Sequence, residues 1–160
     1  MYRIESLQFY DYDEFRDMFL DYFVNDCEVK YDKDKLRENL INKTIIPQCE
    51  RGLIFIDLIK QNEEILGFII YQIDKEECDW KERLGSGFIR EFYIKPNFRK
   101  LGLGSKLLKN AEDKLKELGA KEIYLTSQEK DNVKQFYKKN GYVTQHNRAN
   151  NGQEYFEKKL

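Results

Sequence analysis

The segment that most constrains the fold is Ile94–Ser105 (IKPNFRKLGLGS), where a strand pattern stops and a helix pattern starts. The preceding run Gly87–Lys95 (GFIREFYIK) is rich in β-formers and is followed by Pro96, which cannot donate to a strand ladder. Beyond Gly104, leucines recur at helical spacing until Gly119, the expected C-cap. A strand, a glycine-containing turn and a long amphipathic helix together predict a sheet that packs against helices.

Six further runs predict strands, and no linker, repeat or low-complexity tract separates them. They are Tyr2–Phe9, Gly52–Lys60, Ile65–Ile73, Lys121–Thr126, Tyr142–Gln145 and Gln153–Lys159. Only a short polar turn lies between Gly52–Lys60 and Ile65–Ile73, so these two runs predict an antiparallel hairpin.

Two further helix patterns begin at aspartates that can act as N-caps, and a third covers Asp131–Asn140. The candidate caps are Asp11 or Asp13 for the first helix and Asp32 or Asp34 for the second. The first helix ends near Asn25 with Tyr22 on its apolar face, and the second ends before Pro47. The resulting order β-α-α-β-β-β-α-β-α-β-β predicts one domain over residues 1–160. Its predicted class is α/β (α+β), with one mixed, mostly antiparallel sheet of about seven strands and helices on both faces.

Composition excludes several classes of protein. Apolar residues make up 41% and charged residues 36% of the chain, which is typical of a globular protein. The longest strongly apolar run, Ile65–Tyr71, is far shorter than the roughly 20 residues that span a bilayer, so we expect no membrane association. The net charge of −1 is too close to zero for binding nucleic acid through bulk charge.

Cysteine and histidine usage indicates neither a metal centre nor a disulfide framework. Cys27, Cys49 and Cys78 form no C-x-x-C pair, and His146 is the only histidine. A Ser-His-Asp triad would have to use His146, and no G-x-S-x-G motif accompanies it. We therefore expect no metal, reduced cysteines without a catalytic role, and a cytoplasmic location.

The turn after the strand at 87–95 has the features of an anion site. The first turn of a helix presents unpaired N–H groups, and glycines let a phosphate approach the backbone closely. Arg99, Lys100 and Lys106 add positive charge nearby. Lys106 is misplaced for a Walker loop, and Leu107 stands where a Rossmann fingerprint needs glycine. What remains is the pattern R-x-x-G-x-G.

Charge is also distributed unevenly along the chain. Residues 1–50 hold 12 Asp/Glu against 7 Lys/Arg, whereas residues 95–139 hold 12 Lys/Arg against 6 Asp/Glu. This asymmetry suits a protein that binds a cationic substrate and an anionic cofactor. Ordinary solvated helix faces explain the same pattern, so both interpretations stay open.

Two motifs resemble a known family. The segment 91–108 (EFYIKPNFRKLGLGSKLL) resembles motif A of the GNAT family, the GCN5-related N-acetyltransferases. Asn132–Tyr142 (NVKQFYKKNGY) is similar to the family's next conserved block, although Gln135 stands where Ala is frequent and Tyr142 replaces the usual Phe. The predicted strand and helix order matches the GNAT fold from about Tyr2 to Leu160.

The resemblance implies acetyl-CoA as cosubstrate. It implies that the backbone of Phe92 and Ile94 hydrogen-bonds the pantetheine arm, and that Asn132 contacts the cofactor. It also implies that Tyr137 protonates the leaving thiolate. The residues implied to hold the pyrophosphate are Arg99, Lys100, Leu101, Gly102, Leu103 and Gly104 through their backbone N–H groups, together with Ser105. The structural alternatives are plain strand core for Phe92 and Ile94 and an amphipathic core tyrosine for Tyr137.

Acetyl transfer to an amine needs a base, since a lysine-like amine is neutral in only about 1 molecule in 2,500 at pH 7. Glu91 is the leading candidate because it lies on the strand that carries the cofactor contacts; a surface or ion-paired Glu91 is the alternative. Tyr93 shares its side of the strand and can shape the approach of the amine. The backbone N–H of Ile94 is the natural donor to the developing oxyanion.

The sequence therefore predicts an N-acetyltransferase that acts on a cationic primary amine by direct attack. We expect the acceptor site to be built from the two N-terminal helices, the loop at 74–86 and the turn at 146–152. The family resemblance leaves a homodimer open. A GNAT-like acyl-CoA-binding or regulatory module without turnover is the second interpretation, and a nucleotide-binding protein is the third.

Overall fold

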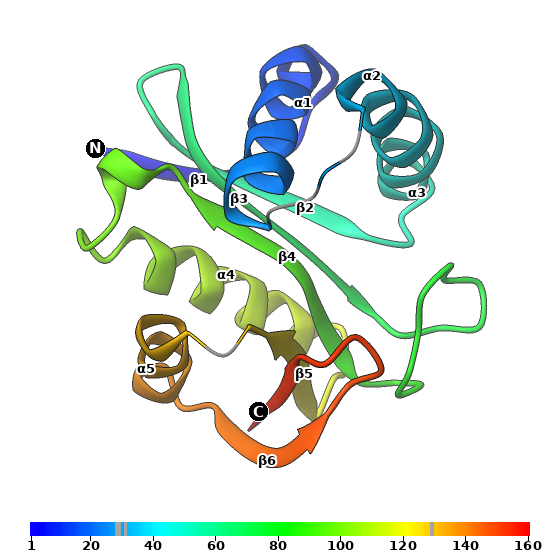
Figure 1. The fold of residues 1–160 in the computed structure, drawn as a ribbon, viewed down its shortest axis with the longest axis vertical. Helices are drawn as coiled ribbons and strands as arrows, with labels where there is room; N and C mark the ends of the chain where they lie inside the picture. The colour runs from blue at the N-terminus through cyan, green and yellow to red at the C-terminus, as the bar shows by residue number, and fades with distance from the viewer. Residues whose placement is uncertain (28–29, 31, 129) are drawn as a thin grey trace. The chain divides into compact units, whose positions relative to one another are not determined.

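A computed structural model describes residues 1–27, 30, 32–128 and 130–160. Within these residues the chain forms a seven-stranded sheet in the order β1-β2-β3-β4-β5-β7-β6 (Figure 1). The strands are β1 (Tyr2–Ser6), β2 (Phe55–Gln61), β3 (Glu64–Ile73), β4 (Gly87–Ile94), β5 (Glu122–Ser127), β6 (Val143–Arg148) and β7 (Glu154–Lys159). β4 and β5 pair in parallel, whereas β1/β2, β5/β7 and β6/β7 are antiparallel, which confirms the predicted mixed sheet.

Helices connect these strands in the predicted order. The longer α-helices are α1 (Tyr12–Asp21), α4 (Leu103–Glu117) and α5 (Asp131–Lys139). A helical segment at 33–50 combines α2 (Lys33–Lys35), the π-helical η3 (Leu36–Ile45) and α3 (Ile46–Glu50). Single turns form η1 (Phe9–Asp11), η4 (Pro96–Phe98) and the π-helical η2 (Tyr22–Asp26). In the part of the chain that the structure describes, no helix has the length and apolarity needed to cross a membrane.

The chain divides into two compact units. The first comprises residues 1–70 and 91–107, and the second comprises residues 71–90 and 108–160. Three elements, β3, β4 and α4, run from one unit into the other. Each unit has buried apolar residues of its own. The prediction of a single domain over residues 1–160 stays a prediction.

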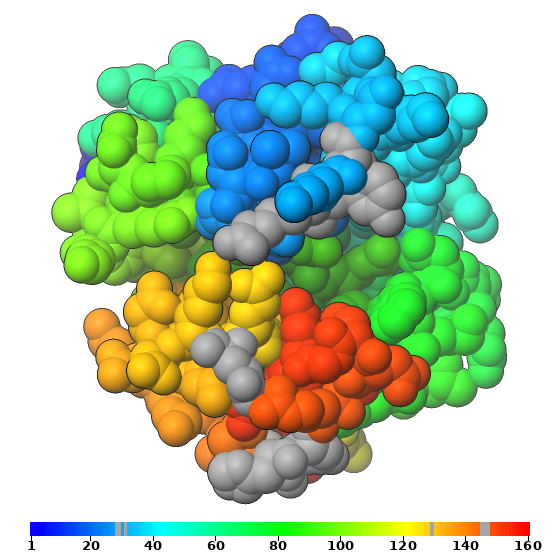
Figure 2. All heavy atoms as spheres, viewed as in Figure 1, coloured from blue at the N-terminus to red at the C-terminus, as the bar shows by residue number. Residues whose placement is uncertain are grey.

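The core of the first unit is aromatic where α1 meets the sheet. Phe15 and Phe19 of α1 are buried, and their rings lie 5.5 and 5.4 Å from that of Phe68 on β3. α1 also lies beside the segment 33–50, and Figure 2 shows their atoms (blue, and light blue to cyan) meeting on one face. Arg16 Nε donates to Asn42 Oδ1 across this contact at 2.7 Å. Packing of aromatic rings in such pairs stabilises a core beyond the area that they bury.

One predicted helix boundary is confirmed and one is wrong. The first helix ends close to Asn25, as predicted, although its last turn, η2, is π-helical. The second helix does not end before Pro47 but continues to Glu50. Pro47 is the second residue of α3, which follows the π-helical η3 without a break. Asp32 is the N-cap of the second helix, since its carboxylate accepts from Asp34 N–H at 2.9 Å.

The two long helices that end in the second unit both end at a glycine, and the one at Gly119 was predicted. After α4, Ala120 N–H donates to Leu115 O and Gly119 N–H to Lys116 O, each at 3.0 Å. These are the two bonds of a Schellman motif, and the φ of +99° at Gly119 suits glycine. Gly141 ends α5 in the same way, with a φ of +90°. One boundary differs: β6 continues to Arg148, so the turn before β7 is shorter than the predicted one.

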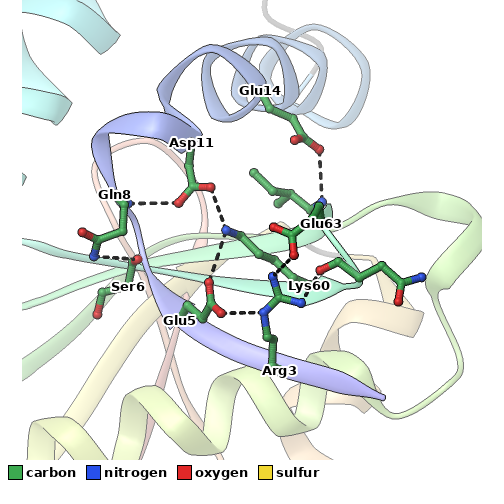
Figure 3. Close-up of polar contacts among 10 residues, drawn as sticks. Arg3, Glu5, Ser6, Gln8, Asp11, Glu14, Lys60 and Glu63 are labelled. Carbon is green, nitrogen blue, oxygen red and sulfur yellow. Dashed lines mark hydrogen bonds and ion pairs between the residues drawn. The ribbon is translucent and has the colours of Figure 1, made fainter.

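A buried lysine ties η1 to the sheet of the first unit. The Lys60 side chain is only 2% exposed, and its ammonium lies 2.7 Å from Asp11 and 3.3 Å from Glu5 (Figure 3). The other oxygen of Asp11 accepts from Gln8 N–H at 3.0 Å. Burial acts to lower the pKa of Lys60, but the hydrogen bonds to Asp11 and Glu5 outweigh it and raise this pKa. In the sequence, Lys60 is simply the last residue of a predicted strand, so its burial was not predicted.

We predict that Asp11→Asn destabilises the protein by about 3 kcal/mol, because it leaves a buried ammonium without its nearest counter-charge. Chemical denaturation at pH 8 measures this change. Asp13→Asn is the matched control, since Asp13 is fully exposed in its pair with Arg16 and its loss should not be measurable. The raised pKa of Lys60 means that its contribution is present at lower pH and is lost as pH rises beyond 10.5. Equal stability of the two variants at pH 8 would contradict the account.

Candidate active site

The last residues of β4 carry the predicted base and its neighbour on one side of the strand. The Glu91 carboxylate accepts a hydrogen bond from the Tyr22 hydroxyl. The ring of Tyr93, two residues further along β4, lies 5.5 Å from the Tyr22 ring. Because both residues meet the same tyrosine, Glu91 and Tyr93 share one face of the strand, as side-chain alternation predicts.

Tyr22 is a site residue that the sequence pattern assigned only to the apolar face of the first helix. Its ring does pack among Phe23 and Phe68, at 5.4 and 5.6 Å. Its hydroxyl, however, reaches the carboxylate of Glu91. Burial and the charge of Glu91 raise the pKa of Tyr22 well above its ordinary value, so Tyr22 is the proton donor of the pair. Periodicity alone cannot reveal such a contact, because a tyrosine ring packs on an apolar helix face whether or not its hydroxyl reaches a polar partner.

The backbones of β3 and β4 approach closely at Gly67. A Cβ at this position would lie 2.6 Å from Ile94 Cδ1 and would also clash with the carbonyl oxygen of Tyr93. Lys95 N–H donates to Leu66 O at 2.8 Å beside this contact. Glycine at position 67 therefore allows β3 to approach the end of β4 closely. The sequence predicts cofactor and oxyanion contacts from Phe92 and Ile94 at this end of β4.

The turn between β4 and α4 has the backbone of an anion site. Lys100 and Gly102 adopt left-handed conformations, with φ of +63° and +80°. Lys106 N–H donates to Gly102 O at 3.2 Å and makes the first helical bond of α4. The N–H groups of Leu103–Ser105 therefore belong to the first turn, which has no acceptors within the helix. Such a turn binds phosphate through its N–H groups and the helix dipole.

Arg99 ties this turn to β4. Its Nε donates to Ile94 O at 2.7 Å, and its guanidinium pairs with Asp26 of η2 at 2.8 Å. The same group lies 5.4 Å from the centre of the Tyr93 ring. The Arg99 side chain was expected to add positive charge for an anion, but its guanidinium forms an ion pair with Asp26. Lys100 and Lys106 are exposed near the helix start.

The two remaining predicted residues lie on α5, in the second unit. Asn132 is exposed in the first turn of α5. Tyr137 is buried, and its ring lies 5.7 Å from Tyr142 and 5.6 Å from Phe156. This packing fits a core tyrosine, and the roles of Asn132 and Tyr137 toward a cofactor stay predictions. The first unit thus brings together Glu91, Tyr93 and the turn at 95–105.

Comparison with known proteins identifies the family. The model of the acetyltransferase (GNAT) family matches residues 12–142. The chain belongs to the GNAT family. This membership confirms the resemblance found in the two motifs, the predicted fold class and the prediction of an N-acetyltransferase. A search of curated protein sequences found no match.

Solved GNAT structures share this fold at low sequence identity. The PaiA N-acetyltransferase from Thermoplasma acidophilum, in complex with coenzyme A, is 20% identical with a TM-score of 0.76. The alignment covers 100% of this chain and 99% of that one. A GNAT acetyltransferase from Staphylococcus aureus Mu50 is 18% identical with a TM-score of 0.74, over 100% and 99% of the chains. YncA from Salmonella typhimurium, determined with its cofactor acetyl-CoA, is 12% identical with a TM-score of 0.76, over 100% and 94%.

We predict that Gly104→Val weakens coenzyme A binding about 100-fold, the loss expected from two charge-assisted hydrogen bonds. A helical Cβ points toward the N-terminus of its helix, so the valine side chain would occupy the space in front of the first-turn N–H groups. Isothermal titration calorimetry measures the change. Lys116→Val, which adds the same side chain at an exposed site later on α4, is the control and should bind normally. Normal affinity in Gly104→Val would exclude this turn as the diphosphate site.

Proposed function

We propose that this GNAT protein transfers the acetyl group of acetyl-CoA to a cationic primary amine by direct attack. The observation that carries the proposal is the position of Glu91: it lies on β4 a few residues before the anion turn, and Tyr22 holds its carboxylate. A carboxylate on the strand that is proposed to bind the cofactor can remove the proton of an ammonium group. The cysteine pattern of the sequence supports a cytoplasmic location.

The first-turn N–H groups of Leu103–Ser105 would bind the diphosphate of acetyl-CoA, with Lys100 and Lys106 adding charge. The pantetheine arm is an extended amide chain, so it would hydrogen-bond the backbone of Phe92 and Ile94 as a neighbouring strand does. The positive φ at Lys100 and Gly102 supports this role for the turn, since successive N–H groups in such turns converge on an anion.

In the reaction, the Glu91 carboxylate takes a proton from the ammonium group, directly or through a water. The neutral nitrogen then attacks the thioester carbon: the C–N bond forms, the C–S bond breaks and coenzyme A leaves as a thiolate. The N–H of Ile94 would donate to the carbonyl oxygen as it gains negative charge. Tyr137 would give the thiolate its proton. The acetylated nitrogen, which still carries a second proton and a positive charge, would lose that proton to solvent, and Tyr137 would recover its own proton from solvent. Asn132 would contact the cofactor.

The acceptor is proposed to be cationic because acidic residues prevail in the first 50 residues. Near β4, burial raises the pKa of Tyr93, with Asp26 and Asp21 adding to this rise and Arg99 opposing it. The loop at 74–86 and the turn at 146–152 stay part of the proposed acceptor site. The side chains of residues 145–147 lie outside the part of the chain that the structure describes.

Release of free thiol distinguishes this proposal from an acyl-CoA-binding module without turnover. Both functions predict that acetyl-CoA raises the melting temperature, since a ligand that binds only the native state stabilises it. Only the enzyme releases free coenzyme A when amines are present. Stronger stabilisation by ATP or NAD than by coenzyme A would instead favour a nucleotide-binding protein.

We predict that amines with a second positive charge are acetylated at least tenfold more efficiently, by kcat/KM, than neutral amines of similar size, because opposite charges attract in a partly desolvated site. A thiol-release assay across a panel of diamines, amino sugars, peptide amines and neutral amines measures this ratio. Raising the salt concentration should reduce it. Acetylation of only neutral or acidic amines would overturn the charge argument.

We predict that Tyr137→Phe lowers kcat at least tenfold with little change in the affinity for acetyl-CoA, because it removes the proton donor to the leaving thiolate. Steady-state kinetics and calorimetry measure the two effects separately. Phe136→Leu, which changes the neighbouring ring without removing a hydroxyl, is the control. An unchanged kcat would remove Tyr137 from the mechanism and leave it as a core tyrosine.

A further inference from the structure

The Tyr22 side chain is held on several sides before its hydroxyl meets Glu91. Its ring lies 5.6 Å from Phe68 of β3 and 5.5 Å from Tyr93 of β4. Phe19 and Phe23 flank it along its own helix, at 6.1 and 5.4 Å. Rings packed in this way have little rotamer freedom, so the position of the hydroxyl is fixed by the core of the first unit.

The helix is wider than an α-helix at this residue. The carbonyl oxygen of Tyr22 accepts from the N–H of Cys27, five residues later, at 3.2 Å. Tyr22 is also the first residue of the π-helical η2. The π-helical conformation is rare and frequently lies at functional sites. Here the turn lies where α1 ends and the tyrosine hydroxyl reaches β4.

Titratable and charged groups that act on Tyr22 or Tyr93 lie around this contact. These groups are Asp21 at the end of α1, Tyr22, Asp26 and Cys27 in and after η2, Tyr93 on β4, and Arg99 in the turn, whose guanidinium pairs with Asp26. A donated hydrogen bond favours the ionised form of a carboxylate, so the Tyr22 hydroxyl favours a negative Glu91.

We propose that Tyr22 is the positioning residue of this active site, and that its hydroxyl orients the Glu91 carboxylate and keeps it ionised to receive the proton of the acceptor amine. This inference rests on the proposed function, because it assigns Glu91 the role of base. Tyr22 does not touch the reacting atoms itself. It acts through Glu91, as an outer hydrogen-bond partner orients a catalytic group.

Tyr22→Phe tests the proposal because it keeps the ring and removes only the hydroxyl. Loss of a hydrogen bond to the charged form raises the pKa of Glu91, by roughly one unit. The acid limb of the kcat/KM profile should therefore move to higher pH by about one unit. Loss of the fixed orientation of the carboxylate should separately lower kcat at pH 7 about tenfold. The KM for acetyl-CoA should change less than about twofold.

Tyr12→Phe is the matched control. The Tyr12 hydroxyl donates to Glu50 at 2.9 Å, so this variant also removes a tyrosine–carboxylate hydrogen bond from the first unit. It lies at the other end of α1, and its pH profile should coincide with that of the wild type. A profile that moves equally in both variants, or in neither, would overturn the proposal.

A second measurement separates this inference from the proposed function. Carbon-13 NMR of the glutamate carboxyl groups gives the pKa of Glu91 in the protein without substrate, with the signal assigned through Glu91→Gln. The pKa should rise in Tyr22→Phe and stay unchanged in Tyr12→Phe. An unchanged pKa in Tyr22→Phe overturns the inference whether or not the protein turns over. A raised pKa with no thiol release by the wild type supports the contact and contradicts the proposed function.

A variant of the other partner, Glu91→Gln, tests the same contact if Tyr22→Phe does not fold. Glu91→Gln removes the negative charge that helps to raise the pKa of Tyr22, so the Tyr22 phenol should ionise at lower pH than in the wild type. Absorbance at high pH, compared between Glu91→Gln and the wild type, measures this shift. An identical tyrosine titration in the two proteins would overturn the proposal.

Discussion

The alternation of side chains along β4 is the constraint on which the site depends. Successive residues of a strand point to opposite faces, so Glu91 and Tyr93 meet Tyr22 on one face. Close approach of β3 at Gly67 then fixes the backbone of the same residues. A shift of one residue in the register of β4 would exchange Glu91 with Phe92 and remove the proposed base from the face that Tyr22 contacts.

The sequence predicted the elements with strong periodicity. The strand at 87–95, the helix after Gly104 and the helix-ending glycine at 119 all lie where the patterns placed them. These features depend on local chemistry: β-branched and aromatic runs, leucine spacing and glycine conformation. The R-x-x-G-x-G turn could be proposed as an anion site for the same reason, since such a site would use backbone N–H groups that glycine spacing reveals.

Features that depend on contacts between distant segments were not predictable from patterns. Tyr22 belongs to an apolar helix face by spacing, and only the fold brings its hydroxyl to Glu91, 69 residues later. Gly67 stands in an ordinary β-rich run, and its need for glycine arises from the neighbouring strand. Lys60 is buried because Asp11 and Glu5 neutralise it, a compensation that no local pattern encodes. Each of these cases involves long-range pairing rather than local propensity.

The central claim is that the backbone N–H groups at the start of α4 bind the diphosphate of acetyl-CoA. Proton–nitrogen NMR during titration with acetyl-CoA tests it most directly, because an amide that donates to a phosphate shifts strongly downfield. The account predicts such shifts at Leu103, Gly104 and Ser105, saturating together at one affinity. Saturating binding that leaves these three amides unmoved would contradict it.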